Sequence, residues 1–271
     1  MIEYSVFPGG KKRVVTFSYD DGPVQDERLI ALFNKYGVKG TFHLNGQTYK
    51  GMSDGQLEKV RALYQGHEIA CHTLQHGYME RMPGVSLVNE IMRDRLILEK
   101  IAGYPVMGMS YPCGSVNDLS LDALRVCGIL YSRTTKPDHR MHLPKEPLLW
   151  DPTCHHKDAM PLAEKFMDML ESYWCGPLLY IWGHSHEFKC EEDWQYMEAL
   201  VKKVAGNDQI WYATNMEIYT YLTAQRQLLV SADEKMLMNP TATDVWVEID
   251  RGNTNDGSVV HIPAGKTVIL P

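Results

Sequence analysis

The sequence lacks several features that mark common classes of protein. It has 27 lysines and arginines against 34 aspartates and glutamates, a formal net charge of −7, and no basic cluster longer than Lys11-Lys12-Arg13. This charge argues against nucleic acid as a partner. No apolar run approaches the ~20 residues that a membrane-spanning helix needs, and Met1-Ile2-Glu3-Tyr4-Ser5 resembles no signal peptide. We therefore expect no membrane partner and a cytoplasmic location, unless a secretion signal has been trimmed away.

Close cysteine pairs are also missing. The six cysteines are scattered, and no two form a Cys-x-x-Cys motif: Cys71, Cys113, Cys127, Cys154, Cys175 and Cys190. Without a secretion signal, this pattern favours free thiols in a reducing compartment. It also argues against a zinc site built from thiolates, because such sites use closely paired cysteines.

What the sequence does contain is an alternation of short apolar runs and longer amphipathic ones from residue 14 to about 222. This alternation predicts parallel strands covered by helices, and the apolar content of 44% can fill a sizeable core. The expected strands are 14–17, 40–44, 68–71, 107–111, 129–133, 148–151, 178–182 and 210–213. The expected helices are 25–36, 56–65, 87–101, 119–127, 161–174 and 194–204. Their number favours an α/β fold of the distorted (β/α) barrel type, with seven or eight strands.

Two segments depart from this alternation. Residues 132–158 contain four prolines and are predicted to form a long loop around one strand, and loops of this length are often functional. After residue 222, three short strand-like runs at 245–249, 259–262 and 267–270 are separated by Asn, Asp and Gly. We therefore expect a barrel domain over residues 1–228 and a small β-rich appendage over residues 229–271.

The chain has two adjacent carboxylates at the end of its first predicted strand. Ser18-Tyr19-Asp20-Asp21-Gly22-Pro23 follows a run rich in β-branched residues, and Gly-Pro indicates that the strand stops there. Side chains alternate between the two faces of an extended chain, so Asp20 and Asp21 should point in different directions and have different roles. An acidic turn that caps the next helix is the simpler alternative for this motif taken alone.

A pair of histidines follows another predicted strand. His72 and His76 in His72-Thr73-Leu74-Gln75-His76 are four residues apart, a spacing that on a helical turn brings both rings to a single ion. Two hydrogen-bonded histidines without a metal are the alternative. The aspartates and the histidines both come just after the carboxyl ends of predicted strands, where barrel enzymes assemble their active sites.

These motifs together resemble those of a known family. Residues 18–23 and 72–76 are similar to the first two motifs of the NodB-homology polysaccharide deacetylases, carbohydrate esterase family 4. Three further segments occur where the family has its remaining motifs, in the same order: Ser110-Tyr111-Pro112-Cys113-Gly114, Trp150-Asp151 and Ile181-Trp182-Gly183-His184. The resemblance covers roughly residues 10–222, and its third and fourth motifs are degraded in this chain.

The resemblance implies a role for each matching residue. Asp21, His72 and His76 would bind a divalent metal, for which Zn²⁺ is preferred although Co²⁺, Ni²⁺ or Fe²⁺ can occupy such ligands. A metal-bound water would be the nucleophile, and Asp20 would be the general base that takes its proton. The backbone N–H of Cys113 would donate a hydrogen bond to the oxyanion. His184 would be the general acid, and the Asp151 carboxylate would orient it.

The chain departs from the family pattern in two respects. Many members have an Arg at the position of Ser110, where it holds the base carboxylate, and Ser cannot supply that charge. We hypothesise that Arg133 reaches Asp20 instead; the alternative is a surface arginine at a loop. In addition, His184 and His186 are both possible acids, and His184 is preferred because it closes the apolar run. His43, by contrast, is expected to be a hydrogen-bonded core residue.

These observations favour a metal-dependent hydrolase that removes N-acetyl groups from an amino-sugar polymer or oligosaccharide. The expected partner is thus an N-acetylated carbohydrate, or a small amide if the chain is an amidohydrolase of the same fold. An inactive metal-containing carbohydrate-binding protein and a non-haem iron oxygenase are further alternatives. Asp20 argues against mere binding, because a binding protein needs only the three ligands. The sequence does not indicate an oligomeric state.

Overall fold

Eight parallel strands form the central sheet in the computed structural model, which describes residues 1–170, 172, 176–249 and 258–270. They are β2 (Arg13–Asp20), β3 (Gly40–Leu44), β4 (Glu68–Cys71), β5 (Gly108–Ser110), β6 (Tyr131–Arg133), β7 (Cys154–His155), β8 (Leu178–His184) and β9 (Ile210–Tyr212). Their order is β6-β5-β4-β3-β2-β8-β7, and β9 pairs with the first residues of β2. The predicted barrel of seven or eight strands is therefore confirmed.

Strand β2 is the centre of this sheet, and all eight of its residues are buried. It pairs with β3 on one side and with β8 on the other, so that Asp20 lies opposite both His43 and His184. At the far edge, an isolated bridge between Arg133 and Trp150 joins β6 to the segment that leads into β7. This bridge thus links the two ends of the strand order through the segment before β7.

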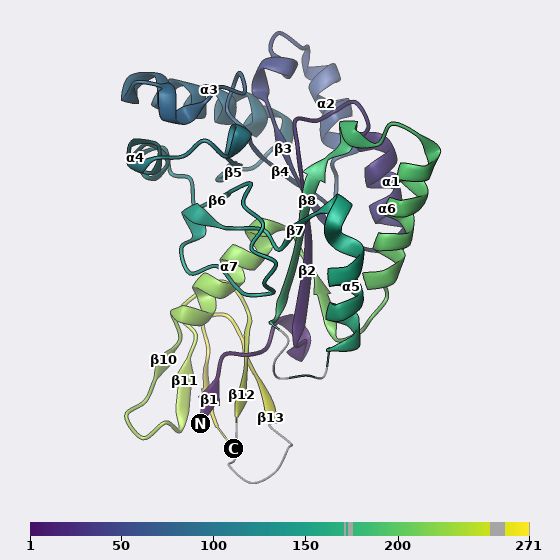
Figure 1. Cartoon of the computed structure of the whole chain (residues 1–271). Coiled ribbons are helices and arrows are strands. Elements are labelled where there is room, and N and C mark those ends of the chain that lie inside the picture. Colours follow the sequence, from purple (N-terminus) through teal and green to yellow (C-terminus); the bar gives the residue numbers. More distant parts are fainter. Residues whose placement is uncertain (171, 173–175, 250–257, 271) are drawn as a thin grey trace.

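Within the described residues, seven α-helices follow or cover these strands. They are α1 (Asp26–Tyr36), α2 (Asp54–Leu63), α3 (Gly84–Ala102), α4 (Asp118–Val126), α5 (Ala159–Asp168), α6 (Glu191–Val204) and α7 (Asn215–Arg226). Figure 1 shows α1, α5 and α6 along one flank of the sheet, and α6 contacts both of the other two. A capping box begins α2, because the Gln56 side chain accepts a hydrogen bond from the Ser53 amide at 2.9 Å.

Short 3-10 helices connect several of these elements. They are η1 (Pro8–Gly10), η2 (Gly46–Tyr49), η3 (Met79–Arg81), η4 (Pro112–Gly114), η5 (Pro147–Leu149), η6 (His156–Asp158) and η7 (Ser185–Glu187). Among the helices of the described residues, none is both long and apolar enough to cross a membrane.

The structure corrects the predicted elements at three places. The strand predicted at 148–151 is wrong, because Pro147 begins η5, and the segment that pairs with β8 comes later, as β7. Helix α7 was not predicted. The helix predicted at 161–174 corresponds to α5, which ends at Asp168, and residues 171, 173 and 174 lie outside the described part.

Two small antiparallel sheets lie below α7 in Figure 1. One contains β1 (Ile2–Glu3), β12 (Val245–Ile249) and β13 (Ser258–Ile262); the other contains β10 (Leu229–Val230), β11 (Met236–Met238) and β14 (Thr267–Ile269). Three of these strands were predicted, and β1, β10 and β11 were not. Because β1 pairs with β12, the chain start contributes to the C-terminal sheets. The domain boundary after residue 228 stays a prediction.

The hydrophobic core has two parts. One lies between the barrel and its helices, around Phe17, Phe33 and Phe42. The other joins the base of the barrel to the C-terminal sheets, and there Val14 and Leu237 belong to one cluster. The five cysteines in the described residues are free thiols, and Cys175 lies outside them.

Candidate metal and acid–base site

Asp20, the last residue of β2, is held between two donors at the carboxyl end of the barrel strands. Its side chain is 2% exposed. One oxygen, Oδ1, accepts a hydrogen bond from Ser110 Oγ at 2.9 Å, and the other, Oδ2, accepts one from Arg133 Nη2. Burial alone would raise the pKa of Asp20, but the Arg133 guanidinium together with His72 and His43 outweighs it and holds the pKa well below its usual range. Asp20 is therefore a carboxylate.

Arg133 reaches this carboxylate from β6, and its side chain is fully buried. Its Nε donates to Ser18 Oγ at 3.1 Å and its Nη1 to the Thr134 carbonyl at 2.8 Å. The guanidinium carbon lies 4.3 Å from the centroid of the Trp182 ring. The predicted contact between Arg133 and Asp20 is thus present, and its effect on catalysis stays a prediction. The surface position considered as the alternative is wrong.

Asp21 turns away from Asp20, toward the histidines. Its Oδ1 lies 3.5 Å from His72 Nε2 and 3.3 Å from His76 Nε2. The predicted divergence of the two aspartates is present, but its cause differs: Asp21 has φ of 73°, so the chain has already left the extended conformation. Similarly, His72 and His76 meet in a loop with φ of 56° at His76, rather than on a helical turn.

His72 is fixed on its other side by the strand β5. Its Nδ1 lies 3.0 Å from the Ser110 carbonyl and 2.7 Å from Ser110 Oγ, which leaves Nε2 directed at Asp21. Asn45 holds the loop by donating from Nδ2 to the His72 carbonyl at 2.7 Å. Burial lowers the pKa of His72, which favours the neutral ring that binds metals.

The donor set of Asp21, His72 and His76 fits a divalent transition metal. The three ligand atoms lie within 4.8 Å of one another. Asp21 Oδ1 is buried, and within the described residues it has no hydrogen-bond partner. A buried carboxylate oxygen of this kind is costly unless a cation or a donor meets it. Two imidazoles and one carboxylate with open positions suit Zn²⁺, and related cations accept the same ligands.

Two further histidines face this group from the end of β8. His184 Nε2 and His186 Nδ1 each lie 3.9 Å from Asp21 Oδ2. His184 is the last residue of β8 and its side chain is 24% exposed, whereas His186 lies in η7 and is 46% exposed. Burial lowers the pKa of His184, but the carboxylates of Glu187, Asp20 and Asp21 outweigh it, so that the net shift is upward.

The carboxylate beside His184 is Glu187, and the predicted pairing with Asp151 is not what the structure shows. Asp151 is exposed and accepts a hydrogen bond from Thr134 Oγ1. Glu187 Oε1 lies 3.7 Å from His184 Nδ1. Glu187 lies beside His184 because the helical turn of η7 brings residues three apart to the same side. The sequence His184-Ser185-His186-Glu187 has this spacing, but it indicates the contact only if a turn is predicted there. Sequence reasoning missed Glu187 because that turn was not foreseen.

The remaining predicted residues include Cys113 and His43. Cys113 follows β5 within η4 and has φ of 54°. His43 is buried as expected, with Nε2 2.9 Å from Ser18 Oγ, and burial lowers its pKa to about 3. Sequence reasoning missed Ser18, which links His43 to Arg133.

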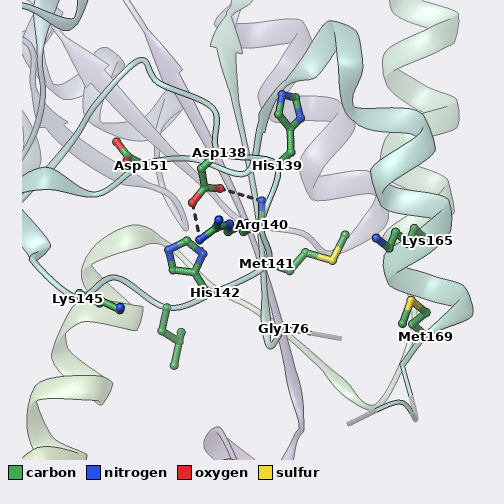
Figure 2. Close-up of a pocket in the computed structure, with 11 residues that line it drawn as sticks. Asp138, His139, Arg140, Met141, His142, Lys145, Asp151, Lys165, Met169 and Gly176 are labelled. Carbon is green, nitrogen blue, oxygen red and sulfur yellow. Dashed lines mark hydrogen bonds and ion pairs between the residues drawn. The ribbon is translucent and has the colours of Figure 1, made fainter. Parts of the chain in front are cut away.

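Asp151 instead faces a cavity of about 960 Å³ formed largely by the proline-rich loop. Figure 2 shows Asp138 there, directed at the Arg140 amide and the His142 ring. The residues that line this cavity include neither Asp20 nor the three candidate ligands. We therefore place the chemistry at the barrel mouth, where the titratable groups converge.

Part of this chain is similar to known proteins. Residues 8–132 match the family model described as Polysaccharide deacetylase. A chitin deacetylase from Pestalotiopsis sp is 31% identical over 108 residues, which cover 40% of this chain and 36% of that protein. The first curated relatives are each matched over less than half of their own length.

Solved structures show the same fold. The Xyl-CE4 domain of a multidomain xylanase from the hindgut metagenome of Trinervitermes trinervoides has a TM-score of 0.54 at 18% identity, covering 78% of this chain and 92% of that one. Puue allantoinase has a TM-score of 0.61 at 13% identity, covering 79% of this chain and 91% of that one. At these identities the likeness concerns the fold alone.

Proposed function

We propose that the protein hydrolyses N-acetyl groups of an amino-sugar polymer or oligosaccharide, because residues 8–132 match the family model described as Polysaccharide deacetylase. The observation that carries this proposal is the convergence of three groups at one end of the barrel: a carboxylate held by Arg133, a donor set for a cation, and a histidine beside a carboxylate. The activity of the relatives, one of which is a chitin deacetylase, supports the choice of substrate class.

Asp21, His72 and His76 would hold the cation, with Zn²⁺ as the proposed metal. When bound, a divalent cation at these ligands supplies positive charge that lowers the pKa of a water molecule and polarises the amide carbonyl. Ser110 keeps the His72 ring oriented for this role, because its carbonyl and hydroxyl both contact Nδ1.

Asp20 acts as the general base in this proposal. Its carboxylate is not one of the proposed cation ligands, because its two oxygens face Ser110 and Arg133, unlike those of Asp21. The carboxylate is ionised and can accept the proton of the attacking water, while Arg133 fixes its position. Burial of Arg133 beneath Trp182 keeps water from screening this pair.

His184 acts as the general acid for the leaving amine. Its Nε2 faces Asp21 and its Nδ1 faces Glu187, so a proton on Nε2 points into the opening of the site. Glu187 favours the protonated ring and acts as a positioning residue. The backbone N–H of Cys113 would donate to the developing oxyanion, a contribution of the order of 3 kcal/mol to the barrier.

A direct test measures acetate and free amine released from chito-oligosaccharides and from a panel of small amides. We expect the Zn²⁺-loaded protein to release acetate from the oligosaccharides. Asp20→Asn should lower kcat by about 10²- to 10⁴-fold with the metal content unchanged. Release from small amides only would favour an amidohydrolase of the same fold. The absence of product from both classes, with normal metal content, would contradict the proposal.

A further inference from the structure

A second group of metal-binding side chains lies next to the candidate site. His155 ends β7, His156 begins η6, and Glu187 ends η7. His155 Nε2 lies 3.0 Å and His156 Nε2 3.3 Å from Glu187 Oε2. The three ligand atoms lie within 4.8 Å of one another. The proposed reaction uses neither histidine.

The spacing of this group matches that of a metal site. Tetrahedral ligands at about 2.0–2.1 Å from Zn²⁺ lie about 3.3 Å from one another. The first group has distances of 3.3 and 3.5 Å between its carboxylate oxygen and its two imidazole nitrogens. The second group has distances of 3.0 and 3.3 Å between the corresponding atoms. The two groups therefore share both composition and size.

The Glu187 carboxylate is oriented so that one of its oxygens is left to bind a cation. Lys157 Nζ lies 3.0 Å from Glu187 Oε1 and donates a hydrogen bond to it. The other oxygen, Oε2, is buried and, in the part of the chain that the structure describes, takes part in no hydrogen bond despite the two nearby imidazoles. Oε2 therefore faces the two imidazole nitrogens.

The ring of His156 is held rigidly in place. It is buried, and it stacks on Tyr19, with centroids 5.8 Å apart, and on Phe188, with centroids 4.9 Å apart. Gly183 makes room for it, because a Cβ at that position would lie 2.0 Å from His156 Nδ1. This rigidity leaves His156 Nε2 facing Glu187 before any cation arrives.

We infer that His155, His156 and Glu187 bind a second divalent transition cation of the Zn²⁺ class through Nε2, Nε2 and Oε2. His184 stands between the two sites: its Nδ1 is 3.7 Å from Glu187 Oε1 and its Nε2 is 3.9 Å from Asp21 Oδ2. Among the described residues, the buried His184 Nδ1 also has no hydrogen-bond partner. This inference goes beyond the proposed deacetylase function and does not rest on it.

The test counts bound metal in full-length protein. Chelated protein is reloaded with Zn²⁺, freed of excess metal, and analysed for zinc per chain, with Co²⁺ absorption as a second readout. We expect two equivalents for the wild type and for the control His142→Gln, whose ring is partly exposed and lies in the separate cavity. His155→Gln should bind one equivalent, His76→Gln one, and the double variant none.

Two results would overturn the inference: a single equivalent in the wild type that His76→Gln removes, or two equivalents retained by His155→Gln. A single equivalent that His155→Gln removes and His76→Gln retains would support this site and contradict the first one. Circular dichroism shows whether His155→Gln is folded. If it is not, Glu187→Gln serves the same purpose and should also lose one equivalent.

Discussion

At the scale of single residues, the positive charge beside Asp20 comes from strand β6 and not from β5. Ser110 occupies the position at which the family resemblance leads one to expect an arginine, and its hydroxyl donates to Asp20 Oδ1. The positive charge comes instead from Arg133 on the neighbouring strand β6. Ser110 and Arg133 are paired residues in the sheet, so a side chain from either can reach the same carboxylate.

Replacing Arg133 with Met should lower both turnover and stability. Asp20 would remain buried without its cation, and breaking a buried ion pair costs roughly 3–5 kcal/mol of unfolding free energy. We expect a large fall in kcat with zinc content unchanged, measured by acetate release and metal analysis. The matched control is Arg140→Met, because Arg140 is exposed in the separate cavity. Unchanged kcat in a folded Arg133→Met protein would show that this arginine is dispensable.

The partner of His184 can be tested in the same way. Glu187→Gln removes the carboxylate that lies 3.7 Å from His184 Nδ1, whereas Asp151→Asn changes an exposed group bound to Thr134. We expect Glu187→Gln to lower kcat by at least about tenfold while KM is retained, because the orientation and the charge of the acid change. Asp151→Asn should leave both constants unchanged. A lower kcat for Asp151→Asn with no change for Glu187→Gln would support the pairing of His184 with Asp151 that was expected from the sequence.

At the scale of elements, the end of β8 determines how β7 and η6 pack. Gly183 precedes His184, and the ring of His156 occupies the space where a side chain at 183 would lie. The two histidine-bearing segments therefore depend on the absence of a Cβ at this one position. The requirement is steric, because Gly183 lies within β8 and not at a turn.

Gly183→Ala should displace His156 and destabilise the protein. A Cβ at 2.0 Å from His156 Nδ1 forces the ring or the strand to move, and overpacking of this kind typically costs about 1–3 kcal/mol. Urea unfolding measures the change. Gly55→Ala in α2 is the control, because no atom lies within 4 Å of a Cβ there and alanine favours a helix. Equal stability of the two variants would argue against the proposed packing role.

Strand β4 begins with a buried carboxyl group whose titration should affect stability. Glu68 accepts hydrogen bonds from Thr41, Tyr131 and the Met216 amide, and burial raises its pKa to about 7. The usual value for an unfolded chain is about 4.3. Between these values the folded state holds the proton more strongly, so this group's stabilising contribution is present at low pH and declines as pH rises to 7 and above.

Comparison of the wild type with Glu68→Gln isolates this effect. The variant cannot titrate, so the difference in unfolding free energy, wild type minus variant, should be larger at pH 5 than at pH 8. Denaturant unfolding at the two pH values provides the measurement. A difference that does not change with pH would mean that Glu68 does not retain its proton in the folded protein.

At the scale of the whole molecule, the barrel and the C-terminal sheets share a hydrophobic core. Leu237 of β11 and Val247 of β12 belong to the same cluster as Val14 and Tyr180 of the barrel. Tyr221 of α7 reinforces this junction, because its hydroxyl donates to the Val6 carbonyl at 2.8 Å and accepts from the Trp246 amide at 3.2 Å. We therefore expect the two parts to unfold together.

Leu237→Ala tests this cooperativity. Leu237 is fully buried, so its truncation should cost about 2–5 kcal/mol of unfolding free energy. Calorimetry should show one transition, shifted to lower temperature as a whole. Ile269→Ala in β14, where the side chain is 76% exposed, should change stability by no more than about 0.5 kcal/mol. A separate early transition in the Leu237 variant would show that the C-terminal sheets unfold independently.

Local sequence patterns were enough to identify residues at the carboxyl ends of the parallel strands. β-Branched runs and the turns after them are local signals, and they placed Asp20, Asp21, His72 and His184 at the carboxyl ends of β2, β4 and β8. Ranges such as 40–44 and 68–71 agree with β3 and β4 residue for residue. The contact between Arg133 and Asp20 could be predicted from the sequence, because the carboxyl ends of parallel strands lie at the same end of the sheet.

The groups that meet across long separations in the chain could be identified from the folded structure alone. The turn of η7 selects Glu187 rather than Asp151 as the partner of His184, and the pairing of β1 with β12 joins residues about 245 positions apart. The left-handed backbone at Asp21 and His76, rather than an extended strand or a helical turn, aims their side chains at one point. Such contacts depend on the packing of whole elements, and local sequence patterns do not encode where distant segments meet.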